Sequence, residues 1–256
     1  MMKKHSLVSF LLAMTAAGLA YGLDPLSVEL TVEEPAGIAR KLEPVSGGIP
    51  LPWGKIPKDT SFAVFEGTKE IPSQVLPLVV DEKNCVNWVL VDIQTDLAAK
   101  EKKTFTLKAV KPSAKPAQAL NVTDGAEAVS IDTGRIQLSI SKTQPFSLFA
   151  TVKAGGKSLL DGGKITYVDD TTGTEKIGTA GKPSSVVVEY SGALRVTVAV
   201  KGVFEGDDDS KLRYVARITA WAGRSDVHVK YSLANSSDEH YSWRHIKNSG
   251  IRMKLA

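Results

Sequence analysis

The sequence predicts an all-β protein of two domains. Short runs rich in β-branched and aromatic residues recur along the chain, and many alternate apolar with polar positions. Clusters of turn-forming residues, such as residues 66–70 and 205–211, separate these runs in the manner of hairpin loops. No convincing amphipathic helix follows residue 22. Residues 96–103 are the best candidate for a short helix, and a hairpin loop explains them equally well.

The first residues are typical of an export signal. A basic start, MMKKH, precedes the apolar run 6–20, which is short for a membrane span and ends in small residues. We therefore predict a secretory signal peptide over residues 1–22, with an uncleaved N-terminal anchor as the alternative. No cysteine lies near the cleavage site, which excludes a lipoprotein signal. The mature protein is expected to be secreted or periplasmic, without a transmembrane anchor.

Net charge and cysteine content limit the kinds of partner and site that this protein can have. Loss of Lys3 and Lys4 with the signal lowers the formal charge from +4 to +2, so no basic surface for nucleic acid is predicted. Cys85 is the only cysteine, so an intramolecular disulfide is impossible. Its apolar surroundings favour a small buried residue over a reactive thiol.

A change in composition divides the mature chain. Residues 111–120, KPSAKPAQAL, combine two prolines with Ala and Lys and lack an apolar period. We predict a domain over residues 24–112, a linker over 113–120 and a larger domain over 121–256. Within the latter, the segment 194–201 alternates so that Leu194, Val196, Val198 and Val200 share one face.

The last residues, 249–256, resemble the opening of one more strand without a polar tail. From this pattern we expect the second domain to be incomplete at its C-terminus and the sequence to belong to a longer protein.

Strong catalytic and metal-binding motifs are not found in the sequence. It contains no P-loop, GxGxxG, HExxH or GxSxG, and one cysteine with dispersed histidines cannot form a Cys/His metal cluster. The segment GDDDS, residues 206–210, could bind calcium through its carboxylates. Adjacent side chains of an extended backbone point opposite ways, however, which favours a solvated hairpin tip. No cofactor and no metal site are therefore predicted, and calcium remains an unsupported possibility.

Residues 236–249 form the segment richest in chemically active side chains. An arginine could neutralise a uronate carboxylate, a tyrosine or histidine could move a proton, and a tryptophan could stack on a pyranose. The alternative, which we favour, is a loop whose aromatic rings fold back onto the domain. The candidate substrate-binding residues of this segment are His240, Tyr241, Trp243, Arg244 and His245.

Residues 47–57, GGIPLPWGKIP, hold a further candidate, Trp53. This density of Gly and Pro excludes a helix and disfavours a regular strand. We expect a structural corner that Trp53 plugs from inside, with stacking on a sugar as the alternative. Trp88 shares a face with Val86 and Leu90 and is predicted to lie in the core, whereas Trp221 could lie on either face.

The order of these features resembles a known family. Residues 34–66, 70–78 and 86–107, with the PVSGGIPLPWG corner, the IPSQ turn and the WVLVD strand, are similar to the N-terminal RIFT-type β-barrel of the exo-rhamnogalacturonan lyase family, which includes YetA-like proteins. The second half, from AVSIDTGRIQLSIS through LRYVARITAWAGRSDVHVKYSLANSS (residues 128–237), resembles its central β-sandwich, in the style of galactose-mutarotase-like sandwiches. The sequence departs from the family at residues 81–85, where DEKNC replaces a DGS turn.

The resemblance implies the non-catalytic N-terminal β domains of a secreted polysaccharide-lyase-family protein. The implied partner is an acidic plant-type polysaccharide, pectic rhamnogalacturonan, which the whole protein would cleave by β-elimination. The family's α-helical toroid, which carries most of the active site, would follow, so no catalytic residue is transferred to this chain. The alternative is a stand-alone carbohydrate-binding or structural cell-envelope protein without enzymatic activity.

Overall fold

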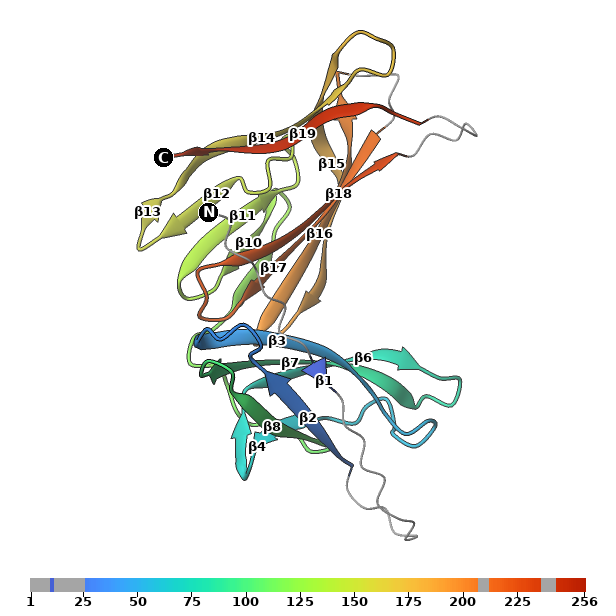
Figure 1. Cartoon of the computed structure of the whole chain (residues 1–256), viewed down its shortest axis with the longest axis vertical. Helices are drawn as coiled ribbons and strands as arrows, with labels where there is room; N and C mark the ends of the chain where they lie inside the picture. The colour runs from blue at the N-terminus through green and yellow to red at the C-terminus, as the bar shows by residue number, and fades with distance from the viewer. Residues whose placement is uncertain (1–9, 12–25, 207–211, 236–242) are drawn as a thin grey trace. The chain divides into compact units, whose positions relative to one another are not determined.

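The computed structural model describes residues 10–11, 26–206, 212–235 and 243–256, and in these ranges all regular structure is β-strand. Every pairing between the strands is antiparallel. The prediction of an all-β protein is confirmed. Within these ranges no helix is long and apolar enough to cross a membrane. The chain divides into two compact units, one ending at Ala117 and the other beginning at Gln118 (Figure 1).

The first unit is built from two sheets. The five-stranded sheet has the order β1-β2-β8-β4-β5, and the three-stranded sheet has the order β3-β7-β6. The strands are β1 (Phe10–Leu11), β2 (Ser27–Glu33), β3 (Arg40–Pro50), β4 (Ala63–Glu66), β5 (Lys69–Ile71), β6 (Ser73–Val80), β7 (Val86–Leu97) and β8 (Lys102–Lys108). Apolar side chains from both sheets, among them Leu30, Val91 and Phe105, form one buried core. Closure of these sheets into a barrel stays a prediction.

Gly47–Pro50 lie in a strand, contrary to the prediction for this Gly- and Pro-rich segment. They end β3 and pair with Trp88 to Val91 of β7. The glycine is needed here, because a Cβ on Gly48 would lie 2.5 Å from Nε1 of Trp88. The indole therefore lies across Gly48 on the face of the sheet opposite Val89 and Val91. Trp88 is 41% exposed, so its predicted place in the core is also wrong.

The chain leaves β3 through the predicted corner, but Trp53 does not plug it. Ile49 and Leu51 are buried, whereas Trp53 is 73% exposed. The two aliphatic side chains fill the space inside the corner, so that the larger indole is left outside. The prediction that Trp53 plugs the corner was wrong, and stacking of the exposed ring on a sugar stays a prediction.

The structure also tests the predictions for residues 96–103 and for Cys85. Residues 98–101, the middle of the predicted helix or loop, form a turn between β7 and β8 in which Lys100 has a left-handed φ of 62°. Cys85 is half-buried instead of fully buried, and it lies directly before β7, where it forms an isolated bridge with Pro57.

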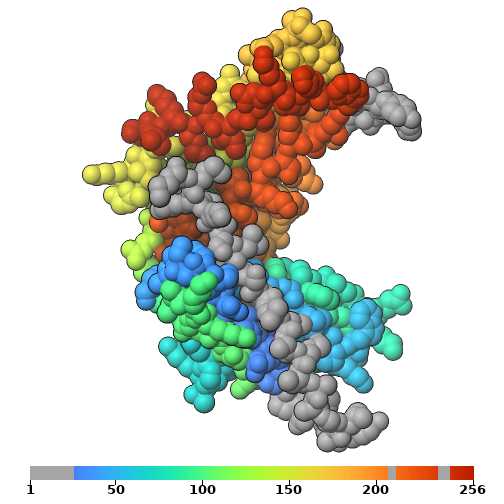
Figure 2. Space-filling model, viewed as in Figure 1, coloured from blue at the N-terminus to red at the C-terminus, as the bar shows by residue number. Residues whose placement is uncertain are grey.

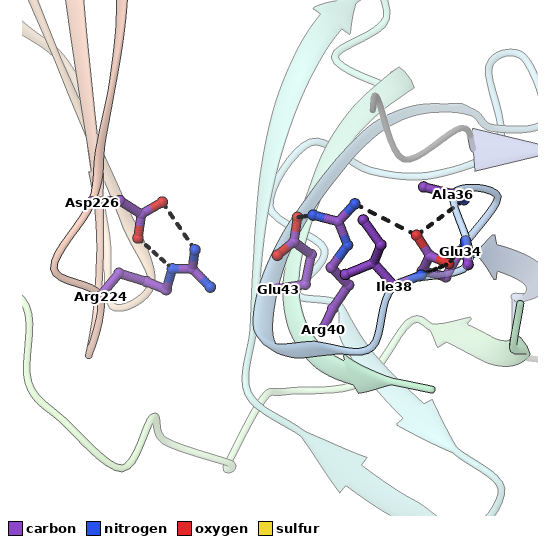
Figure 3. A network of polar contacts seen from close by, with 8 residues as sticks. Glu34, Ala36, Ile38, Arg40, Glu43, Arg224 and Asp226 are labelled. Atoms are coloured by element: carbon purple, nitrogen blue, oxygen red, sulfur yellow. Dashed lines mark hydrogen bonds and ion pairs between the residues drawn. The ribbon is translucent and has the colours of Figure 1, made fainter. Parts of the chain in front are cut away.

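A buried carboxylate fixes the turn that follows β2. Glu34 accepts hydrogen bonds from the backbone N–H groups of Ala36, Gly37, Ile38 and Lys100. It also forms an ion pair with Arg40 at 3.5 Å (Figure 3). Burial by itself raises the pKa of the Glu34 carboxyl. The four N–H donors outweigh this effect and hold the pKa at about 2. The ionised carboxylate is thus part of the folded turn.

The second unit is a β-sandwich of two sheets (Figure 1). The five-stranded sheet has the order β13-β12-β11-β10-β9, and the six-stranded sheet has the order β18-β17-β16-β15-β14-β19. The first consists of β9 (Asn121–Asp124), β10 (Ala128–Asp132), β11 (Ile136–Ser141), β12 (Thr151–Ala154) and β13 (Lys157–Ser158). The second consists of β14 (Leu160–Asp169), β15 (Lys176–Ser191), β16 (Arg195–Glu205), β17 (Leu212–Trp221), β18 (Val227–Asn235) and β19 (Ile246–Leu255).

Aromatic rings fill one end of this sandwich. Phe146 stacks on Tyr214 with a centroid separation of 5.1 Å, and Phe204 forms T-shaped pairs with Tyr214 and Tyr167, at centroid separations of 5.7 and 4.7 Å. Tyr214 donates a hydrogen bond to the carbonyl of Gly181 at 2.9 Å, which satisfies its buried hydroxyl. Burial raises the pKa of this hydroxyl, so it stays protonated.

Glycines make room for two of these rings on the neighbouring strands. Gly178 pairs with Tyr167, and Gly202 pairs with Tyr214. A Cβ on Gly202 would lie 2.2 Å from the hydroxyl oxygen of Tyr214, and one on Gly178 would lie 2.1 Å from the Tyr167 ring. Both tyrosines are fully buried, so neither ring could move aside without disturbing the core.

The alternation predicted for residues 194–201 is confirmed for one face only, because Thr197 and Ala199 of the opposite face are buried as well. Leu194, Val196, Val198 and Val200 are buried together. Trp221, which the sequence left open, is also mostly buried, and the Arg195 guanidinium lies 5.7 Å from its ring.

The final segment is the strand that the sequence predicts. β19 pairs along β14, and its side chains are mostly exposed (Figure 2). The aspartates of residues 207–209 lie outside the described residues. Within the described ranges, no cluster of His, Cys, Asp or Glu has the arrangement of a metal site.

Candidate functional site

The sequence-predicted site residues fall on two separate units. Trp53 belongs to the first unit, and Trp243, Arg244 and His245 belong to the second. His240 and Tyr241 lie outside the described residues. We therefore describe two sites.

The loop that carries Trp53 is held by hydrogen bonds on both sides. Gly54, with a left-handed φ of 66°, donates its N–H to Oδ1 of Asn87 at 2.8 Å, and Leu51 donates to the Asn87 carbonyl at 3.0 Å. Further along the loop, the N–H of Val86 bonds the Ile56 carbonyl at 2.7 Å. Asn87 is buried, so these bonds are shielded from water. The backbone under the exposed indole is therefore fixed.

The turn between β6 and β7 forms the other wall. Asp81 accepts the N–H groups of Lys83 and Cys85, each at 2.9 Å, and the side-chain amide of Asn87 at 3.2 Å. The Cys85 N–H and the Asn87 amide hold the pKa of the Asp81 carboxyl below its usual range. Asn87 thus links the Trp53 loop to the turn through its carbonyl oxygen on one side and its NH₂ on the other.

Between the loop and the turn lies a cavity of about 570 Å³, which we call the Trp53 pocket. It has an aromatic wall, an aliphatic wall from the edge strand β6 and charged groups at its rim. Its lining residues are Trp53, Gly54, Lys55, Val79, Val80, Asp81, Glu82 and Lys83. The volume lies within the range of small-ligand sites. An apolar plane beside hydrogen-bonding and charged groups is the arrangement that binds a sugar ring by its C–H face.

The second site joins the start of β19 to the end of β14. Arg244 forms an ion pair with Asp169 at 3.5 Å, and both side chains are largely buried. Asp169 also accepts the N–H of Thr171 at 2.8 Å, and Thr171 in turn accepts the N–H of His245 at 2.8 Å. The His245 ring contacts the Asp170 carboxylate through Nδ1.

These contacts make Arg244 a structural residue. Moving its guanidinium to a uronate would leave the nearly buried Asp169 carboxylate without its ion pair, which is costly. His245 and Trp243 remain accessible, and Trp243 is 77% exposed. The expectation that the aromatic residues of this loop fold back is therefore wrong for Trp243.

Sequence reasoning found Trp53 but missed the residues that build its pocket. Val79 and Lys83 are distant from Trp53 in sequence, and only the pairing of β6 with β7 brings them near the loop. Asn87 carried a usable signal, because an amide within an apolar strand must find partners when it is buried.

Comparison with known proteins shows which protein family the chain belongs to. The fold is an all-β chain whose second unit is an antiparallel sandwich, and the model of the PcRGLX-like protein central beta sandwich domain matches residues 120–256. This chain therefore belongs to the PcRGLX-like, or rhamnogalacturonan lyase, family. The family resemblance expected from the sequence is confirmed.

A solved structure is similar to the chain over both units. It is a protein in the glycosyl hydrolase family 38 from Enterococcus faecalis, with a TM-score of 0.57 and 12% sequence identity. The match covers 92% of this chain and 33% of that protein, so the chain spans about a third of its length. At this identity the likeness concerns the fold alone. A search of the curated proteins finds no match.

Proposed function

We propose that this chain provides the non-catalytic β domains of a secreted polysaccharide-lyase-family protein, and that its Trp53 pocket binds pectic rhamnogalacturonan. The observation that carries the proposal is an indole 73% exposed on a backbone fixed by Asn87. Folding leaves this ring in water beside the half-exposed Val79 and Val80, which line the same cavity, and an exposed apolar patch of this kind is typical of a ligand-binding surface.

The proposed ligand fits the chemistry of the pocket. Rhamnogalacturonan alternates neutral and acidic sugars, so one ring can stack on Trp53 while a neighbouring uronate approaches an ammonium group. Lys55 and Lys83 line the pocket together with Asp81 and Glu82, and their ammonium groups can approach such a carboxylate. Asp81 does not compete strongly, because its oxygens accept the hydrogen bonds of the turn.

In the whole protein, the proposed reaction is β-elimination. A cation neutralises the uronate carboxylate, the C5 proton becomes more acidic, a base removes it, and the glycosidic oxygen leaves with the electron pair. Arg244 is engaged by Asp169, and no described residue of the Trp53 pocket is a histidine or tyrosine base. We therefore assign binding to this chain and the elimination to the protein of which these domains form part.

Calorimetric titration with rhamnogalacturonan oligosaccharides tests the binding role. Trp53→Ala should weaken binding about tenfold, since an aromatic contact of this kind is worth about 1 kcal/mol or more. Trp53→Phe should retain most of the affinity. Leu78→Ala, which removes a half-exposed side chain from β6 outside the pocket, is the matched control and should bind normally. Equal affinity of Trp53→Ala and the unchanged protein would refute the assignment.

Trp243 provides the second arm of the same experiment. It is as exposed as Trp53 but belongs to the other unit. Loss of binding in Trp243→Ala, with Trp53→Ala unaffected, would move the site to the start of β19. Saturable binding without any gain of unsaturated-uronate absorbance in the whole native protein would favour a carbohydrate-binding protein over a lyase.

Secretion has its own test. If residues 1–22 are an export signal, N-terminal sequencing of the protein recovered outside the cytoplasm should begin close to residue 23. Recovery of protein that still starts at Met1 would contradict the proposal.

A further inference from the structure

The outer face of the five-stranded sheet carries two parallel rows of polar side chains. Val129, Ile131 and Leu138 point into the sandwich core, so the alternate residues of the same strands point outward. The antiparallel register aligns these outward residues across β9, β10, β11 and β12. One row consists of hydroxyl side chains, namely Thr123, Ser130, Ser139 and Thr151. The adjacent row consists of longer side chains, namely Asn121, Asp132, Gln137 and Lys153.

The difference in side-chain length creates a hollow. Short Ser and Thr side chains form its floor, and the longer row stands beside it. The eight residues of the two rows, together with Ile131 and Leu138 beneath, line a cavity of about 280 Å³, which we call the hydroxyl trough. This volume is at the lower end of ligand sites and suits a single sugar ring better than a larger molecule.

Hydrogen bonds within the trough orient its polar groups before any ligand arrives. Asp132 accepts the N–H of Gly134 at 2.8 Å and the amide of Gln137 at 2.9 Å. Ser139 and Thr151 share a hydrogen bond of 2.8 Å between their hydroxyls. Groups held in this way lose little freedom on binding, which lowers the entropic cost of association.

We propose that the hydroxyl trough is a second carbohydrate subsite, selective for a neutral sugar residue. Its hydroxyls and amides can both donate and accept, as the hydroxyls of a sugar require. The single carboxylate of Asp132 and the single ammonium of Lys153 leave the trough without net charge, so a uronate gains no selective attraction there. A protein partner fits less well, because the trough has no exposed apolar centre.

This inference takes its ligand class from the proposed function, but it concerns different residues on a different unit. The Trp53 pocket offers an aromatic ring for stacking beside two lysines and two carboxylates, whereas the trough has no aromatic ring and offers hydrogen-bonding groups. A polysaccharide of alternating neutral and acidic sugars contains ligands for both. Each hydrogen bond to a neutral group contributes modestly, so the trough is expected to bind a free sugar in the millimolar range.

Amide NMR of the full-length chain, titrated with L-rhamnose and separately with D-galactose, provides the test. Shifts should cluster on β10 and β11. Ser130→Val removes one hydroxyl and adds an apolar group to the floor, and we expect it to weaken binding about fivefold or more. Ser232→Val makes the same change at an exposed serine of β18 and should leave binding unchanged. If Ser130→Val changes the spectrum throughout the fold, Ser130→Ala takes its place in the titration. We expect Ser130→Ala to show a smaller loss of affinity.

The two proposals can fail separately. Pectic binding that depends on Trp53, without neutral-sugar shifts on β10 and β11, would overturn the trough and leave the proposed function standing. Neutral-sugar shifts abolished by Ser130→Val, in a protein whose pectic binding ignores Trp53, would support the trough and overturn the Trp53 assignment. Equal neutral-sugar affinity of Ser130→Val and Ser232→Val would also overturn the trough.

Discussion

The two units of this chain differ in where they place the aromatic rings that lie over glycines. In the second unit, Tyr167 and Tyr214 are fully buried, and each ring occupies space provided by a glycine on the next strand. In the first unit, Trp88 also lies over a glycine, Gly48, but it does so on the outer face, and Trp53 is exposed on a fixed loop. A glycine thus makes room for a large ring in both units, directly opposite the ring in the second unit and two residue pairs along the strand in the first, where Gly48 pairs with Leu90. The first arrangement serves a core and the second a surface.

The difference shows what decides the role of an aromatic residue. A buried ring is held by contacts on all sides, so it contributes to stability and cannot meet a ligand. An exposed ring on a rigid backbone contributes little to stability, and its flat face remains available. Substitutions at the two kinds of glycine separate these roles.

The largest effect is expected from Gly202→Ala. The added methyl would overlap the Tyr214 hydroxyl, which is buried and bonded to Gly181, so the ring or its strand must shift. Overpacking of this kind destabilises by about 3 kcal/mol. Denaturant unfolding of the full chain measures it, with Gly250→Ala as control, because a Cβ on Gly250 meets nothing within 4 Å. Similar free energies of unfolding for the two variants would contradict the claim that Gly202 makes room for a firmly packed ring.

An intermediate effect is expected from Glu34→Gln, and it should depend on pH. The folded pKa of about 2 lies below the ordinary value of 4.5, so the ionised carboxylate stabilises the fold fully above about pH 4.5. This contribution is lost as the pH falls toward 2. The variant should therefore be clearly less stable at neutral pH, and the difference should shrink steadily between pH 4.5 and 2.

Urea unfolding at several pH values checks this course. Glu29→Gln, an exposed residue of β2, is the control and should change stability little at any pH. A difference between Glu34→Gln and the unchanged protein that grows on acidification would contradict the role given to this carboxylate.

The smallest effect is expected from Gly48→Ala. Its methyl would meet the Trp88 indole at 2.5 Å, but this ring is 41% exposed and can turn toward solvent. We expect a loss of about 1 kcal/mol or less, together with a red shift of tryptophan fluorescence. A loss as large as that of Gly202→Ala would mean that Trp88 is as firmly packed as the buried tyrosines.

Pattern alone could predict much of the fold, because strand periodicity is a local property. The alternation in 194–200 predicted one buried face of β16, although Thr197 and Ala199 on the other face are buried too, and the final apolar segment is strand β19. The same rule failed at Trp88, where register shifts between β6 and β7 change which residues share a face. Such irregularities depend on the partner strand, and a single segment carries no trace of them.

The features of the candidate site also divide into those that the sequence predicts and those that only folding decides. The sequence by itself determined that Trp53 sits among glycines and prolines, and that Arg244 and His245 accompany it as candidates. Only the tertiary structure decided that Ile49 and Leu51 occupy the inside of the corner and leave the indole outside. It also decided that Asp169 holds Arg244, and that four strands align their hydroxyls into one trough. Composition and periodicity depend on neighbouring residues in the sequence. Burial, charge pairing and cross-strand alignment depend on residues that only folding brings together.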